Sequence, residues 1–144
     1  VDKGIKDANN MGAAMAPAAY ATIQAHFQDT GRKPSDYDLI VTGDLGKLGW
    51  EIVFDFFHKD GMDLGNLKDC GMLIYDLGIK TYTAGLRVRM LGVVLSGLLL
   101  NGMREGRWKN ILFCGTGALL SPTSTQQGES IPAICHAVAI STQK

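Results

Sequence analysis

The segment DYDLIVTGDLG, residues 36–46, predicts a buried strand over Tyr37–Thr42 that runs into a glycine-rich turn. A helix is expected to begin near Asp44 and to end at Gly61. It places five apolar side chains at helical spacing, facing a core: Leu48, Ile52, Val53, Phe56 and Phe57. A strand, a turn and a helix in this order are typical of an α/β protein.

Two apolar segments near the carboxyl end extend this pattern. WKNILFCG (108–115) predicts a strand from Trp108 to about Cys114, followed by a turn, GTGALLSPTS (115–124). PAICHAVAIS (132–141) predicts a last strand, and its apolar residues at both odd and even positions indicate burial on both faces. These two strands would form an antiparallel hairpin.

The remaining segments predict helices and connections. Ala and large apolar residues from Met11 to Phe27 indicate a buried helix whose regular part begins near Pro17 and which Gly31 closes. Residues 62–71 are expected to be a loop and residues 72–76 a short strand, and a long helix is expected over Leu86–Glu105. The fold class predicted from this order is α/β, a mixed sheet layered with helices.

Composition narrows the functional classes. The 144 residues carry no formal net charge, so the basic field that a nucleic-acid partner requires is absent. The longest apolar stretch, residues 90–103, is shorter than the ~20 residues of a membrane-spanning helix. Three cysteines without CxxC spacing favour a reducing compartment and argue against a zinc site or a disulfide framework. We expect no metal and no cofactor.

Four stretches carry a resemblance to a known family. They are DANNMGAAMAPAA (7–19), DLIVTGDLGKLG (38–49), DCGMLIYD (69–76) and ILFCGTGALLSPTSTQQGESIPAICHAVAI (111–140). In this order, over nearly the whole chain, they resemble the stage V sporulation protein AD family of spore-forming bacteria. The resemblance implies a thiolase-like fold, of which residues 1–144 would be the carboxyl-terminal half as a single domain. Because the chain opens with Val1 and not Met, we expect it to be a fragment of a larger two-half protein.

The resemblance also implies a function. Members of the family are expected to bind dipicolinic acid and to contribute to its uptake into the forespore, in peripheral association with the inner spore membrane. The implied partners are dipicolinic acid, other stage V sporulation A proteins and, because an isolated half would expose apolar surface, a second copy in a homodimer. Two alternatives stay open: half of a β-ketoacyl synthase or thiolase-type condensing enzyme, and a structural scaffold for the dipicolinate channel of the spore membrane.

One tract departs from the family pattern. Residues 85–92 read GLRVRMLG, where the family shows a run of Gly, Ser and Cys. In condensing enzymes the corresponding turn carries a catalytic Asn or His, and here Leu86 to Leu91 are mostly bulky. The turn at Thr42-Gly43-Asp44 also lacks the His of the synthases. We therefore expect no catalytic residue and no enzyme activity, with His26, His58 and His136 in structural roles.

The candidate ligand-binding residues lie in two glycine turns and one helix. Gly43, Asp44 and Gly46 offer backbone amides to an anion, or else form a tight turn with Asp44 as helix N-cap. Gly115, Thr116 and Gly117 would contact a ligand at the end of a strand, or simply permit a bend. Arg87 and Arg89 suit the two carboxylates of dipicolinate, although residues two apart face different sides of a helix. Cys70 follows Asp69, which opposes a thiolate, so an inert thiol is favoured.

Overall fold

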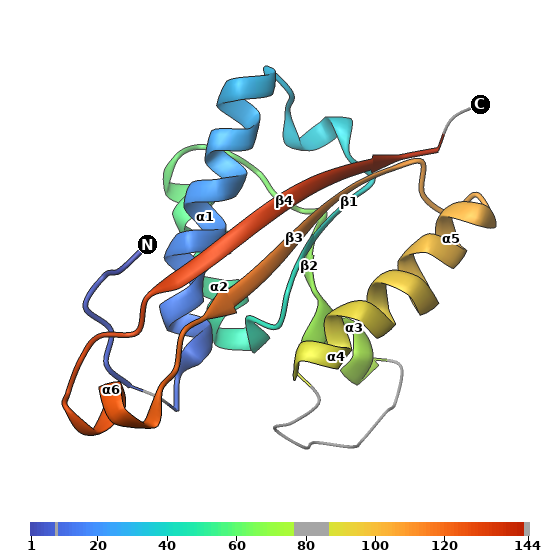
Figure 1. Ribbon diagram of the computed structural model, residues 1–144. Helices are drawn as coiled ribbons and strands as arrows, with labels where there is room; N and C mark the ends of the chain where they lie inside the picture. The colour runs from blue at the N-terminus through green and yellow to red at the C-terminus, as the bar shows by residue number, and fades with distance from the viewer. Residues whose placement is uncertain (8, 77–86, 143–144) are drawn as a thin grey trace.

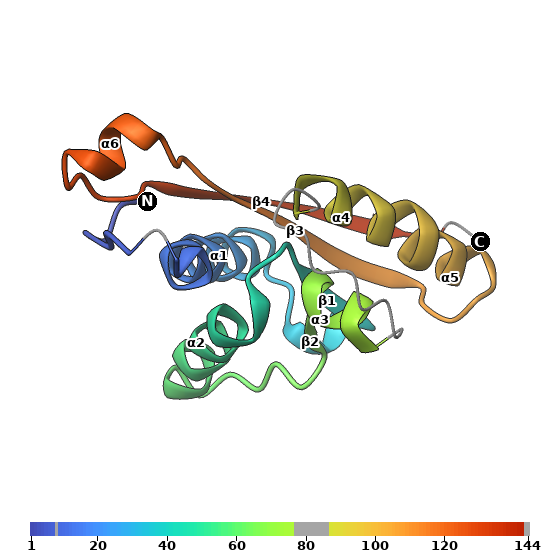
Figure 2. The ribbon, with the colours of Figure 1, turned by 90° about the horizontal axis from the view of Figure 1, so that it is seen from below.

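The computed structural model describes residues 1–7, 9–76 and 87–142. Its strands form one mixed sheet in the order β2-β1-β3-β4, with helices on both faces (Figures 1 and 2). β1 (Leu39–Thr42) pairs in parallel with β2 (Leu67–Asp69) and with β3 (Asn110–Ala118). β4 (Ala133–Ser141) runs antiparallel to β3. The predicted α/β class, the mixed sheet and its closing hairpin are confirmed.

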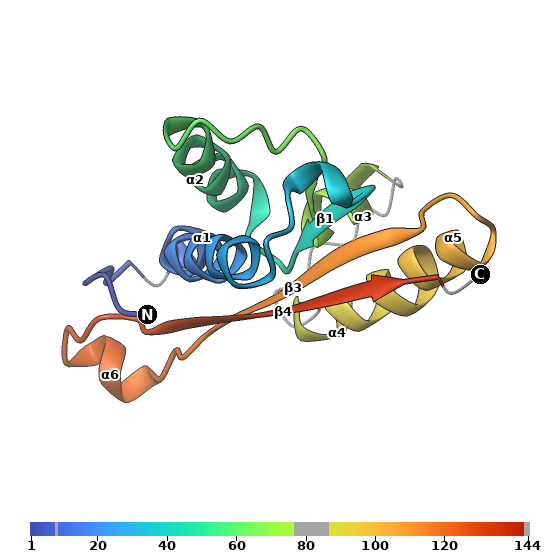
Figure 3. The same cartoon turned by 90° about the horizontal axis from the view of Figure 1, so that it is seen from above.

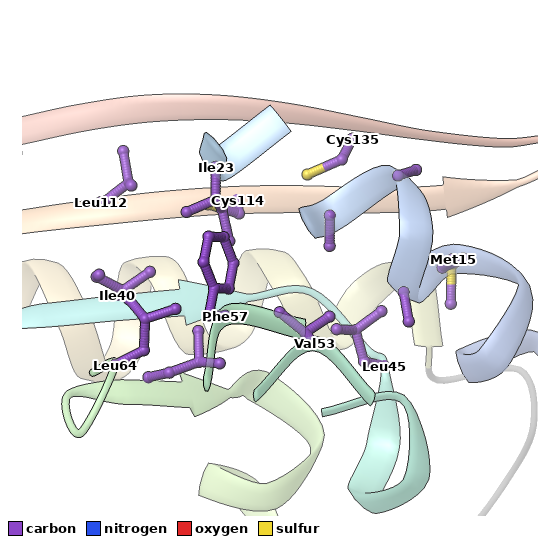
Figure 4. Close-up of a cluster of buried hydrophobic side chains, with 14 of the residues drawn as sticks. Met15, Ile23, Ile40, Leu45, Val53, Phe57, Leu64, Leu112, Cys114 and Cys135 are labelled. Atoms are coloured by element: carbon purple, nitrogen blue, oxygen red, sulfur yellow. The ribbon is translucent and has the colours of Figure 1, made fainter. Parts of the chain in front are cut away.

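Two helices, α1 (Met11–Thr30) and α2 (Gly46–Lys59), cover one face of the sheet (Figure 3). Ile23 of α1 and Phe57 of α2 are fully buried against Ile40 of β1 and Leu112 of β3, and Figure 4 shows these side chains meeting in one cluster. Burying a side chain of this size stabilises the fold by about 1.5–3 kcal/mol. α1 ends at Gly31 in the left-handed conformation, as predicted.

A run of helical segments covers the opposite face. It consists of α3 (Cys70–Asp76), α4 (Arg87–Val93), the π-helical segment η2 (Val94–Leu99) and α5 (Leu100–Arg104). Buried Val94, Leu99 and Met103 pack against Ile111 and Phe113 of β3. The long helix predicted over 86–105 is confirmed from residue 87 onward, and residue 86 lies outside the described residues. Two short elements, η1 (Pro34–Asp36) and α6 (Pro122–Gln126), lie in connections.

Two expectations about helices are wrong. α1 begins at Met11 and contains Pro17, although proline removes one backbone hydrogen bond and disfavours a helix interior by ~3 kcal/mol. Ala16, Ala18 and Ala19 around it are at most 1% exposed, so packing against the sheet outweighs this local loss. Leu48 does not face the core, because its position on α2 leaves it 50% exposed.

The segment 62–76 is also assigned wrongly from sequence. The expected loop contains β2, whose short LKD sequence lacks an apolar pattern but pairs with β1 through Ile40 and Leu67. The expected strand at 72–76 is part of the helix α3. A short apolar run does not distinguish a strand from a buried helical turn, so tertiary contacts decide.

The carboxyl-terminal hairpin departs from prediction in two ways. Gly115, Thr116 and Gly117 are not a turn but strand residues of β3, held extended by pairing with His136, Cys135 and Ile134. β4 is not buried on both faces, because its residues alternate between buried and exposed along the first half of the strand. Its side chains at 134 and 138 are 55% and 56% exposed.

Candidate functional site

The carboxyl ends of three parallel strands define the candidate site. From β1 the chain passes through α2 to β2 on one side, and then returns to β3 on the other side of β1. Parallel strands end at the same edge of a sheet, and a reversal of strand order opens a crevice there that commonly holds ligands. The reversal lies between β1, which ends at Thr42, and β3, which passes it at Cys114.

At the end of β2, the carboxylate of Asp69 organises the neighbouring turn. It is fully buried and accepts hydrogen bonds from the amides of Leu45 (2.9 Å) and Gly46 (3.2 Å) and from the hydroxyl of Thr42 (2.8 Å). A fourth bond comes from the amide of Gly71, at 3.0 Å. Asp69 thus joins the end of β1, the start of α2 and the start of α3.

This geometry corrects the expected role of Asp44. α2 begins at Gly46, its N-cap residue is Leu45, and no side chain of that residue caps the helix. The first amides of α2 are instead satisfied by Asp69, more than twenty residues further along the chain. Asp69 is not among the site residues predicted from the sequence. Asp69 directly follows an apolar and a charged residue, and this short pattern does not distinguish the end of a strand from a loop.

Two carboxylates approach each other at this end of the sheet. A β-carbon placed on Gly71 would lie 2.9 Å from Oδ1 of Asp44 and 3.1 Å from Oδ2 of Asp69, so only glycine fits between them. Burial raises the pKa of Asp69 to about 7; its bonds from Leu45 and Thr42 act against this rise, and the charge of Asp44 adds to it.

At the reversal point, Gly43 passes directly against β3. Its amide donates to the carbonyl of Cys114 at 2.8 Å. A β-carbon on Gly43 would lie 2.4 Å from Oγ1 of Thr116, 2.9 Å from its amide nitrogen and 3.2 Å from a methyl group of Leu91. The structure therefore brings together two of the predicted glycine segments, and Leu91 of α4 closes over them.

The hydroxyl of Thr116 is the one polar side-chain atom, among the described residues, that is buried and has no hydrogen-bond partner. Leaving such a group unpaired is unfavourable by about 1–3 kcal/mol. A polar ligand at the reversal point would remove this penalty. Thr116 is therefore the predicted site residue with the best support as a ligand contact.

The other predicted site residues are less central. The amide of Gly46 donates to the carboxylate of Asp69. Gly115 lies in β3, and a β-carbon on it would lie 3.6 Å from a methyl group of Leu91. Gly117 lies further along β3, beside Ile134. Arg87 and Arg89 belong to α4, but their side chains lie outside the described residues.

The cysteines and His26 lie in structural surroundings. Cys70 is buried, and burial together with the charges of Asp69 and Asp44 raises its pKa to about 12, which agrees with the expected inert thiol. Cys114 and Cys135 are also buried and free. His26 contacts the hydroxyl of Tyr37 through Nε2 at 2.6 Å. Within the described residues, no helix is both long enough and apolar enough to cross a bilayer.

The fold and site define a mixed α/β protein with a candidate ligand site at its strand reversal. Comparison with known proteins places it more narrowly, because the sequence model of the Stage V sporulation protein AD (SpoVAD) family matches residues 1–141. The chain is also 45% identical over 138 residues to "Stage V sporulation protein AD" of Bacillus subtilis (strain 168). That alignment covers 95% of this chain and 41% of the relative. The chain belongs to the SpoVAD family of sporulation proteins.

Proposed function

We propose that this chain is the non-catalytic, dipicolinate-binding carboxyl-terminal half of a thiolase-like protein, and that it contributes to dipicolinate uptake into the forespore. The observation that carries the proposal is the buried hydroxyl of Thr116 at the strand reversal, which has no hydrogen-bond partner in the described part of the chain. Membership of the SpoVAD family supports the sporulation setting. A carboxylate oxygen of dipicolinate would accept the hydrogen bond that Thr116 otherwise leaves unmade.

The charges around the reversal point constrain how a dianion would bind. Asp44 and Asp69 lie at the same end of the sheet and repel it, although the raised pKa of Asp69 reduces its negative charge near neutral pH. The positive charge that would offset the two carboxylates of dipicolinate must therefore come from other residues. Arg87 and Arg89 belong to α4, the helix that also supplies Leu91 to the reversal point, and guanidinium groups bind carboxylates through two parallel hydrogen bonds.

Two of the three cysteines support the proposed absence of catalysis. Thiolase-type condensation needs a nucleophilic thiolate, and a thiolate forms readily only where the thiol pKa is depressed. Burial raises the pKa of Cys70 to about 12. The hydrogen bond with Cys135, together with burial, holds the pKa of Cys114 well above its ordinary value, and the same bond lowers the pKa of Cys135. The thiols of Cys70 and Cys114 are therefore suited to packing and not to attack on an acyl group.

The proposal extends to assembly and location. Because the chain spans 41% of the relative's length, we propose that the rest of a longer protein completes the pocket. Exposed Val93, Leu119 and Val138 provide apolar surface for that part of the protein or for a second copy in a homodimer. We further propose peripheral association with the inner spore membrane, together with other stage V sporulation A proteins.

Calorimetric titration with dipicolinate tests the site. We expect Thr116→Val to weaken binding by about tenfold, which corresponds to one lost hydrogen bond of ~1.4 kcal/mol. Thr123→Val, on the exposed surface of α6, is the matched control and should bind as the unchanged chain does. Benzene-1,3-dicarboxylate, which lacks the ring nitrogen, serves as the control ligand.

Three outcomes would contradict parts of the proposal. Equal affinity of Thr116→Val and the unchanged chain would remove Thr116 from the site. Absence of binding both by this chain and by the longer protein would favour the structural scaffold. Turnover of an acyl-CoA substrate by this chain would establish the condensing-enzyme alternative.

A further inference from the structure

Leu91 of α4 lies where the two glycine segments of the candidate site meet. A β-carbon added to Gly43 would lie 3.2 Å from Cδ1 of Leu91 and 2.4 Å from Oγ1 of Thr116. The other methyl group of Leu91, Cδ2, is 3.6 Å from the place that a β-carbon on Gly115 would take. The isobutyl group of Leu91 therefore fills the space above two glycines, next to the buried hydroxyl.

The surface beneath Leu91 consists of backbone. Gly43 and Gly115 carry no side chain, and the amide of Gly43 holds the two segments together by donating to the carbonyl of Cys114 at 2.8 Å. Glycine allows a ligand to approach the backbone closely, so a planar ring can lie flat on such a surface. At its border, the hydroxyl of Thr116 is a hydrogen-bond donor that has no partner among the described residues.

Leu91 lies at the boundary between this surface and the exterior of the described chain. Its side chain is half-buried, whereas the hydroxyl of Thr116 is fully buried. The two residues that follow it, Gly92 and Val93, are exposed. Figure 2 shows α4 on the face of the sheet opposite α1 and α2. A ligand that reaches Thr116 from the side of α4 therefore has to pass Leu91.

The backbone of Leu91 is held in place, but its side chain has room to turn. Val94 and Leu99, which follow it on the same run of helices, are buried against β3 and anchor that run. Beside Leu91 there is open space, because a β-carbon on Gly92 would meet no atom within 4 Å. A leucine changes between its staggered rotamers without any change in the backbone. Leu91 can therefore uncover the site while α4 stays in position.

We propose that Leu91 determines the specificity of this site and selects planar aromatic carboxylates. In the ligand-free chain, its isobutyl group covers the glycine backbone and the hydroxyl of Thr116. When a ligand binds, this group turns aside and the ring lies flat on Gly43 and Gly115. One carboxylate then accepts the hydrogen bond of Thr116, and Leu91 packs against the other face of the ring. The inference rests on the proposed function and names the residue that makes the site selective for flat rings.

The alternative is that Leu91 only completes the packing of α4 on the sheet. Two observations favour a role toward a ligand. The fully buried contacts with β3 are made by Val94 and Leu99, whereas Leu91 is half-buried. In addition, an apolar group that covers an unpaired hydroxyl is locally unfavourable, and such conflicts between a side chain and its surroundings are expected at functional sites.

Thiol reactivity tests the cover without any ligand. In Thr116→Cys the new thiol takes the place of the hydroxyl, and a small methanethiosulfonate reagent should modify it slowly. Adding Leu91→Ala should make this reaction roughly tenfold faster or more, because the thiol becomes accessible. Leu91→Met conserves the side-chain volume and should keep the reaction slow. Leu98→Ala, at another half-buried leucine about two turns further along, is the matched control. The native cysteines are buried and give little background. Equal rates with and without Leu91→Ala would overturn the proposal.

Calorimetric titration of this chain, and of the longer protein that contains it, tests the specificity with two dianions. Dipicolinate is planar, whereas cis-cyclohexane-1,3-dicarboxylate carries its two carboxylates on a puckered ring. Leu91→Ala should reduce the preference for dipicolinate by roughly fivefold or more, because the flat ring loses the wall that packs against it. Leu98→Ala should leave the preference unchanged.

Two results of these titrations would count against the role of Leu91. An unchanged preference in Leu91→Ala, with dipicolinate still bound, would overturn the specificity role alone. Absence of dipicolinate binding by the unchanged protein would defeat the proposed function and the specificity role together, and the thiol rates would then decide separately whether Leu91 covers Thr116.

Discussion

The ends of β2 and β3 lie at the same edge of the sheet but are completed in opposite ways. At the end of β2, the carboxylate of Asp69 receives four hydrogen bonds from its own fold. At the end of the pairing between β1 and β3, the hydroxyl of Thr116 is buried with no partner in the described part of the chain. The first arrangement holds the turn in place, and the second leaves a buried hydroxyl without a partner among the described residues. The contrast separates the residues that build the site from the one that we propose as a ligand contact.

The largest effect on stability is expected from a substitution at the end of β2, where Asp69 accepts four hydrogen bonds. Asp69→Ala removes the acceptor of Leu45, Gly46, Gly71 and Thr42 at once. Each buried donor left unpaired is unfavourable by ~1–3 kcal/mol, and water can reach some of these donors in the variant. We therefore expect a loss of about 3–5 kcal/mol in the free energy of unfolding. Urea denaturation measures it. Asp63→Ala, at an exposed position, is the control and should change stability by less than ~0.5 kcal/mol.

The close approach of Gly43 to β3 gives the second prediction. A β-carbon there would lie 2.4 Å from Oγ1 and 2.9 Å from the amide nitrogen of Thr116, so Gly43→Ala must push β1 and β3 apart. We expect a loss of about 1–3 kcal/mol, the usual range for overpacking. Gly65→Ala, whose nearest contact is 3.5 Å from a side-chain oxygen, should be nearly neutral. Equal thermal unfolding temperatures of the two variants would show that the contact at Gly43 is not tight.

How much of this was predictable differs between the two strand ends. The glycine turn after β1 follows from sequence, because an apolar run, a glycine and a helical pattern succeed one another locally. Asp69 does not, because three of its four partners lie more than twenty residues earlier and β2 is too short to show a pattern. Thr116 is among the predicted ligand-binding residues, but the sequence places it in a turn, whereas the structure places it in β3. Its extended conformation comes from pairing with Cys135 across the hairpin, which only the tertiary fold supplies.

The titration of Asp69 gives the third prediction. Burial raises its pKa from 3.8 to about 7, so between these values the native state holds a proton that the unfolded state has released. The contribution of this group to the free energy of unfolding therefore falls as pH rises from about 4 to about 7, by at most ~1.4 kcal/mol per pH unit. Asp69→Asn does not titrate, so the stability of the unchanged chain minus that of the variant should decline through this window. A difference that grows with pH would show that the four donors outweigh burial.

The smallest effect, and the sharpest form of the comparison, comes from the same substitution at two threonines. Thr42→Val removes a hydroxyl that donates to Asp69 at 2.8 Å, so we expect a loss of about 1–2 kcal/mol. Thr116→Val removes a buried hydroxyl that donates to nothing among the described residues, so stability should stay the same or rise by up to ~1 kcal/mol. Denaturant titration of the ligand-free proteins measures both. If Thr116→Val instead destabilises the chain as much as Thr42→Val does, its hydroxyl belongs to the fold, and the distinction between a completed strand end and an open one is lost.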